Sequence, residues 1–328
     1  MNFKNLVMLA MVGAAVAQRP SNVSICDYYT TALLKDNNAT NQYTLLTLLV
    51  NTAVIGNYTQ PNVGVAVPGI LNPNGTYNGT SVNLVPYFDG GLASTNNGSN
   101  AGVAVNFLDG GGAAPLMKNM PAEDNTSRQY MLLTHLYEFF GSLLGCSEVG
   151  MTGFSAYMGD SSMYEVHKFM VLDPYQLGYF ITQISLSVAS FGVAESDISA
   201  VAMALESLFA YRCAPKMTAI EAQGPQYQSL CTDETCPLAA NSTCADQPNI
   251  DQPLVANSTL AMGEGRNASS SSSAVAPSST SMSSRSSTVS ASGTSSGTVP
   301  VQTKSAGSQL SPSMGVLLGL LIVVAFAF

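Results

Sequence analysis

The chain contains two histidines, His135 and His167, and both fall in stretches whose apolar residues repeat at helical spacing. A neutral imidazole is a common metal ligand and can bind through either ring nitrogen. Met163 and Phe169 flank His167 and make its surroundings apolar, which favours a buried ligand role. The alternative is a histidine in the core that is satisfied by one hydrogen bond, the usual state of a lone histidine on an apolar helix.

The six cysteines favour disulfides over metal or thiol chemistry, because their number is even and the chain has other marks of secretion. Three lie in the body of the chain and three in a later segment: Cys26, Cys146 and Cys213, then Cys231, Cys236 and Cys244. If all six pair, at least one bridge must join the two segments. Cys236-Pro237 is also typical of a haem-thiolate ligand, a weaker reading than a disulfide.

Enzyme motifs are missing from the sequence, which has no Gly-x-Ser-x-Gly elbow, no His-Glu-x-x-His and no phosphate-binding loop. Asp-Gly-Gly occurs at Asp89 and Asp109, but this is an ordinary turn signal. The carboxylates of Asp124 and Glu138 have no spacing that pairs them. The sequence therefore favours a protein that is not an enzyme.

The two ends of the chain carry targeting signals. Residues 1–17 combine Lys4, an apolar stretch and a small-residue site at Ala17, the layout of a secretory signal peptide. Near the other end, small residues around Ser305 precede a polar spacer and an apolar tail. This order predicts a glycosylphosphatidylinositol (GPI) anchor at Ser305, with residues 306–328 removed. The alternative is a short single-pass tail.

Ten Asn-x-Ser/Thr sequons also indicate the secretory route and predict N-glycosylation. Their asparagines are Asn22, Asn38, Asn57, Asn74, Asn78, Asn97, Asn125, Asn241, Asn257 and Asn267. With 11 basic residues, a net charge of -9 and no basic cluster, the chain is not expected to bind nucleic acid. We expect a location on the outer face of the plasma membrane or in the cell wall, with wall polysaccharide as a candidate partner.

Composition divides the mature chain into a mainly α-helical body at residues 18–217, a Cys-containing extension at 218–256 and a disordered Ser/Thr-rich stalk at 257–305. Within the body, residues 56–121 form a Gly/Asn-rich insertion, interpreted as a glycosylated coat or, from its alternating valines (63, 65 and 67, then 103 and 105), a small hairpin. Helices are predicted at residues 25–34, 43–55, 128–145, 173–191 and 195–211, together with a short helix that starts at Ser162 and carries His167.

The order of features from Arg128 to Tyr211 resembles the truncated haemoglobins. The matching features are Phe139, Leu144-Gly145, Tyr157-Met158-Gly159, Met163, His167 and Gly192-Val193, with Pro86-Tyr87-Phe88 similar to the family's Pro-Phe-Phe segment. The glycine motifs that shorten the family's early helices are missing here, and two further features depart from the family. Its Phe-Tyr pair on the second helix has no counterpart in residues 48–56, and the insertion is far longer than the family's connection.

The resemblance implies a globin-like fold that binds haem, with His167 as the proximal iron ligand and Phe139, Met163 and Phe169 around the cofactor. His135 lies one helical turn before Phe139 and could reach the iron from the distal side, or it could face solvent or pack between helices. The expected function is surface binding of O2, NO or haem. The alternative is a GPI-anchored wall or adhesion glycoprotein without haem.

Overall fold

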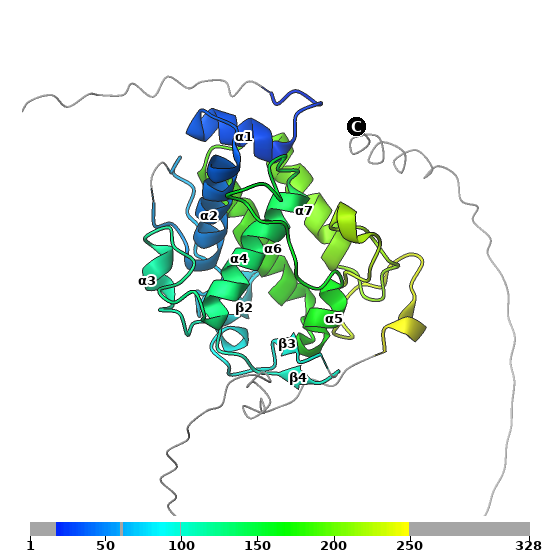
Figure 1. Cartoon of the computed structure of the whole chain (residues 1–328). Helices are drawn as coiled ribbons and strands as arrows, with labels where there is room; N and C mark the ends of the chain where they lie inside the picture. Colours follow the sequence, from blue (N-terminus) through cyan, green and yellow to red (C-terminus); the bar gives the residue numbers. More distant parts are fainter. Residues whose placement is uncertain (1–17, 60–61, 99, 249–328) are drawn as a thin grey trace, which may run out of the picture. The chain divides into compact units, whose positions relative to one another are not determined.

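The computed structural model describes residues 18–59, 62–98 and 100–248, which are mainly helical (Figure 1). The expected signal peptide, stalk and anchor signal, together with Ser305, Asn257 and Asn267, lie outside this part of the chain. None of the helices described is long and apolar enough to cross a bilayer.

The first two helices are α1 (Ile25–Leu34) and α2 (Ala39–Ile55). The side chain of Ser24 caps α1 and that of Asn38 caps α2, each accepting a hydrogen bond from a backbone N–H of the first turn. The structure confirms α1 as predicted, whereas α2 begins four residues before the predicted start because Asn38 provides its cap. Most of α2 is buried, so it forms the centre of the core.

The remaining long helices are α4 (Arg128–Leu143), α6 (Pro174–Ser190) and α7 (Glu195–Phe209), and the short α5 (Met163–His167) continues into the 3-10 helix η2 (Lys168–Met170). These elements confirm the four predicted helical segments to within a few residues. A full capping box opens α6, where Asp173 and Gln176 bond each other's backbone N–H.

Helix α2 packs against both α4 and α6, α6 packs against α7, and α1 covers α2 (Figure 1). The largest fully buried side chains, Tyr137 on α4, Tyr179 on α6 and Phe154 after α4, lie in this core. The structure thus confirms a mainly helical body, held together where apolar helix faces meet.

The insertion forms small elements and no layer of its own. Strand β1 (Gly75–Tyr77) pairs antiparallel with β2 (Thr80–Val82), and β3 (Thr95–Asn96) with β4 (Gly102–Val103). The turn between β1 and β2 is Asn78-Gly79, with both φ angles positive, as a two-residue hairpin favours. The 3-10 helix η1 (Val85–Tyr87) lies between the two hairpins in sequence, and the short α3 (Ala113–Leu116) follows the second.

The predicted valine hairpin is right only in part. Val103 lies in β4, but Val63, Val65 and Val67 are not in a strand. Two of these residues are held by contacts that do not belong to a sheet: Val63 N–H donates to the Ser190 carbonyl, and Val67 N–H donates to the side chain of Asn57. An alternating pattern therefore arose here without a neighbouring strand.

All six cysteines pair, as Cys26–Cys146, Cys213–Cys244 and Cys231–Cys236. The second bridge joins the body to the extension, which confirms the prediction that at least one must. The bond between Cys231 and Cys236 rules out the thiolate reading of Cys236-Pro237. The extension, which also contains the 3-10 turns η3 (Glu221–Gln223) and η4 (Cys244–Asp246), lies against the body, where Leu230 and Cys231 N–H groups donate to the Phe209 carbonyl.

Candidate functional site

His167 ends helix α5 and is held by its own helix. Its Nδ1 donates a hydrogen bond to the Met163 carbonyl over 3.0 Å, one turn earlier. That bond places the ring proton on Nδ1 and leaves the Nε2 lone pair available. Burial lowers the pKa of His167, so the neutral form is favoured. A neutral imidazole with an available Nε2 lone pair has the chemistry that an iron ligand requires.

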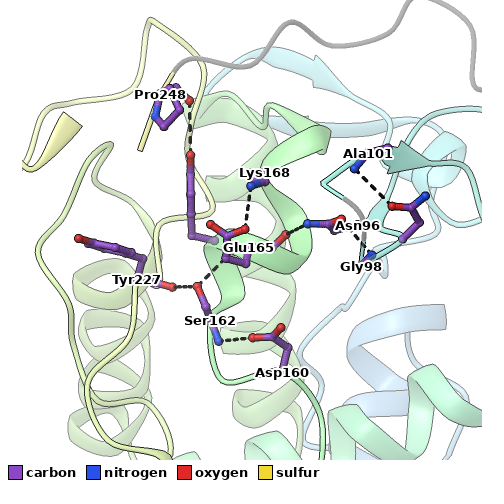
Figure 2. Close-up of polar contacts among 11 residues, drawn as sticks. Asn96, Gly98, Ala101, Asp160, Ser162, Glu165, Lys168, Tyr227 and Pro248 are labelled. Atoms are coloured by element: carbon purple, nitrogen blue, oxygen red, sulfur yellow. Dashed lines mark hydrogen bonds and ion pairs between the residues drawn. The ribbon is translucent and has the colours of Figure 1, made fainter. Parts of the chain in front are cut away.

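The helix that carries His167 is fixed from two sides (Figure 2). Ser162, its N-cap, donates to the Tyr227 carbonyl of the extension, and its N–H donates to Asp160. On the other side, the Asn96 side-chain amide of β3 donates to the Glu165 carbonyl over 3.2 Å. The extension and the β3–β4 hairpin therefore determine where His167 lies.

Two residues of the same helical turn, Glu165 and Lys168, form an ion pair. Lys168 Nζ lies 2.7 Å from Glu165 Oε2 and also stands over the rings of Tyr164 and Phe169, at 5.7 and 5.6 Å from their centroids. Phe169 packs against Gly102 of β4, where an added Cβ would lie 2.7 Å from the Phe169 Cβ. Phe169 thus packs against the hairpin, and Met163, only 7% exposed, belongs to the core.

His135 and Phe139 form a second group on α4, one turn apart. The His135 ring packs edge-on against Tyr157 at 5.7 Å, and Phe139 packs against Tyr157, Phe140 and Phe209. Burial lowers the pKa of His135 and raises that of its neighbour Glu138 to about 7. In the part of the chain that the structure describes, no side chain is hydrogen-bonded to the His135 ring or the Glu138 carboxyl.

The pockets found among the described residues are small and do not include the histidines. A pocket of about 40 Å³ lies among α2, α4, α6 and α7, and two others among the described residues measure about 10 Å³ each. Neither histidine lines any of the three. Pockets that hold cofactors measure roughly 300–1,000 Å³. Nor does any group of three or more His, Cys, Asp or Glu side chains in the described ranges form a metal site.

The Asp-Gly-Gly segments and Asp124 have structural roles. Asp109 accepts hydrogen bonds from the N–H groups of Arg128 and Gln129 and so holds the start of α4. Asp89 accepts from the N–H of Gly91, and Asp124 from the N–H and hydroxyl of Thr126. The interpretation of these segments as turns is confirmed.

Sequence reasoning missed two buried polar clusters. Asp197, 5% exposed, accepts hydrogen bonds from Arg19 (2.8 Å) and from the Tyr29 hydroxyl (2.9 Å). Tyr137 donates to Asn51 over 2.6 Å, and Asn51 in turn donates to the Leu116 carbonyl. No periodic pattern reveals such pairs, because their partners are far apart in sequence; a buried Asn within an otherwise apolar helix was the one available signal.

The sequon asparagines share one property. All eight that the structure describes are exposed: Asn22, Asn38, Asn57, Asn74, Asn78, Asn97, Asn125 and Asn241. Of the ten asparagines outside sequons in the same ranges, five are exposed, and Asn51 is completely buried. Exposure therefore follows the sequon more closely than the residue type.

Comparisons with known proteins add no relative: no family model matches this chain, and no match was found among curated proteins or among solved structures.

Proposed function

We propose that this protein is a secreted, N-glycosylated surface protein, attached to the outer face of the plasma membrane by a GPI anchor or transferred to the cell wall, and that it is not an enzyme. The observation that carries the proposal is the exposure of all eight described sequon asparagines. A glycan is bulky and must project into solvent, so a sequon that had arisen by chance would not need to be exposed. The three disulfides agree with an oxidising compartment.

The local geometry leaves room for the sugar. Asn38 and Asn57 each use the side-chain oxygen to accept a backbone hydrogen bond, from Asn41 and Val67. The sugar is attached to the amide nitrogen of asparagine, which these bonds do not use. Glycosylation at these positions is therefore compatible with the caps and turns that the same side chains form.

The test is to express the full chain in a eukaryotic secretory host and treat it with peptide-N-glycosidase, which converts each glycosylated Asn to Asp. Mass spectrometry should find the 1 Da increase at most of the eight positions, and none at Asn51 as the internal control. Thr40→Ala removes the sequon of Asn38 alone and should abolish conversion there. Secreted protein without any conversion would overturn the proposal.

The anchor at Ser305 has its own test. Phosphatidylinositol-specific phospholipase should release the protein from intact cells, and a chain that ends at residue 305 should appear in the medium. If release fails but extraction by detergent succeeds, the C-terminal segment is instead a membrane tail.

Haem binding through His167, within a globin-like fold, is a second candidate, supported by the bond from His167 Nδ1 to the Met163 carbonyl. When bound, haem supplies an iron that takes O2 or NO. Because the pocket beside α5, lined by Tyr164 and Lys168, measures only about 10 Å³, binding would require side chains around His167 to move. Haemin titration should give a sharp Soret band that His167→Ala abolishes and His135→Ala retains. Identical titrations of wild type and His167→Ala would exclude this ligand.

A further inference from the structure

Methionine dominates the large apolar side chains that the described surface exposes. Six of the ten are methionines; the others are one valine, one leucine and two tyrosines. The six are Met117, Met120, Met131, Met151, Met158 and Met203, between 42% and 83% exposed. In the same ranges the chain has nine methionines and 23 leucines, and only one leucine is exposed.

The difference in exposure between methionine and leucine indicates that the thioether of methionine matters at the surface. Methionine and leucine have similar size and hydrophobicity, similar helix propensity, and both are usually buried. A surface that needed only an apolar side chain would use them alike. The chain instead keeps leucine inside and places methionine outside, both on helices (Met131 and Met203) and in loops (Met151 and Met158). What methionine adds is a sulfur atom that two-electron oxidants attack.

Two methionines that are close in sequence differ in exposure, so their rates of oxidation can be compared within one protein. Met158 is 83% exposed, whereas Met163, five residues later, is 7% exposed and part of the core. A peroxide reaches the first sulfur directly. It reaches the second only when α5 opens.

Oxidation at the exposed positions leaves the fold intact. The sulfoxide is polar, and at an exposed site it is solvated by water without loss of core packing. At Met163 the same product would place a polar group among buried apolar side chains. Four of the six exposed methionines (131, 151, 158 and 203) lie in the stretch from 128 to 240, which has no sequon.

We propose that these six methionines are sacrificial oxidation sites that consume peroxides or hypohalous acids at the protein surface. In each event the thioether takes one oxygen atom and becomes a sulfoxide, while hydrogen peroxide becomes water or hypochlorite becomes chloride. The sulfur is oxidised and the oxidant reduced by two electrons. This inference is independent of glycosylation, anchoring and haem.

The first experiment exposes the purified full-length protein to limiting hydrogen peroxide and follows each methionine peptide by mass spectrometry. The six exposed methionines should be oxidised at least tenfold faster than Met163, with an unchanged near-ultraviolet circular dichroism spectrum. Scoring peptides individually keeps methionines outside the described residues out of the comparison. Oxidation of Met163 at the rate of Met158, or loss of the spectrum, would overturn the proposal.

The second experiment asks whether the six residues protect the rest of the molecule. A variant with all six changed to leucine is compared with wild type at substoichiometric hypochlorite, and modification of His, Tyr and Met163 is measured. We expect modification of these residues to increase at least threefold in the sixfold variant. In the control Met163→Leu, modification of the histidines and tyrosines should not change. If the sixfold variant aggregates, Met158→Leu alone should raise modification of its neighbour Tyr157. Equal modification in variant and wild type would refute protection.

Discussion

The insertion at residues 56–121 and the helical body around it are ordered by different forces. The body is held by apolar helix faces, with α2 between α4 and α6. In the insertion, asparagine and aspartate side chains accept hydrogen bonds from the backbone two residues later. The described residues of the insertion form six such turns, at Asn62, Asn72, Asn83, Asp89, Asn96 and Asn106. Richness in Asn and Gly thus specifies a defined loop structure rather than a lack of one.

Close backbone contacts attach the insertion to the body. Ile70 and Leu71 N–H groups donate to the carbonyls of Ala53 and Val54, at the end of α2. Glycines at 56 and 69 allow this approach, because a Cβ at Gly69 would lie 2.5 Å from the backbone nitrogen of Gly56. The two regions therefore meet in part through main chain, and this close contact can be tested by substitution.

The largest effect is expected from removal of the disulfide whose loop contains the insertion. Cys26–Cys146 joins residues 120 apart, so replacing both by alanine should lower the free energy of unfolding by about 5 kcal/mol. The same change at Cys231–Cys236, only 5 residues apart, should cost about 2 kcal/mol. Urea unfolding under non-reducing conditions measures both. Equal losses would show that loop length does not determine the contribution.

The next effect tests the contact between the two backbones. Gly69→Ala should cost about 3 kcal/mol or more, because the new methyl group meets the backbone of residues 54–56 and the φ angle is +92°. Gly64→Ala is the matched control, with φ +88° and no atom within 4 Å, and should cost about 1 kcal/mol. Urea unfolding again gives the comparison. A small loss at Gly69 would mean that the insertion can move away from α2.

A smaller effect is expected at the polar link between the regions. Tyr137→Phe leaves Asn51, which is bonded to Leu116 of α3, without its hydroxyl donor, and should cost about 1–2 kcal/mol. Tyr227→Phe removes an exposed hydroxyl that donates to Asp246 and should cost clearly less, because water replaces the lost bond. Thermal unfolding of both variants checks the difference, and similar losses would contradict the role of burial.

The smallest expected effect is on the pH dependence of stability and comes from Glu138 in the helical body. Burial raises the pKa of Glu138 from 4.5 to about 7, so the folded protein binds this proton more tightly than the unfolded chain does. Wild type should therefore lose stability relative to Glu138→Gln as pH rises from about 4.5 through 7. Because the side chain is partly exposed, the difference should remain below about 1 kcal/mol. Parallel unfolding curves across this pH range would contradict it.

The sequence predicted the body better than the insertion, for a physical reason. Periodic apolar residues and local caps such as Ser127, Ser162 and Asp173 determine the helices, and both signals lie within a few residues of the element. In the insertion, asparagine and aspartate form the turns locally, but the place of the segment against the body depends on contacts over long sequence separations, such as Tyr179 with the Gly69 carbonyl. The same limit applies to the site. The hydrogen bond of His167 lies within its own helix, but the bonds that join this helix to Asn96 and Tyr227 span long sequence separations.

The bridge between Cys26 and Cys146 also governs what a protease can do to the molecule. A single cut anywhere in the insertion leaves both fragments joined, through α1 on one side and the loop after α4 on the other. The nicked protein keeps its mass until it is reduced, so cleavage would escape a non-reducing gel. Surface loops are where proteases act first, and here such an attack produces a two-chain molecule rather than a released fragment.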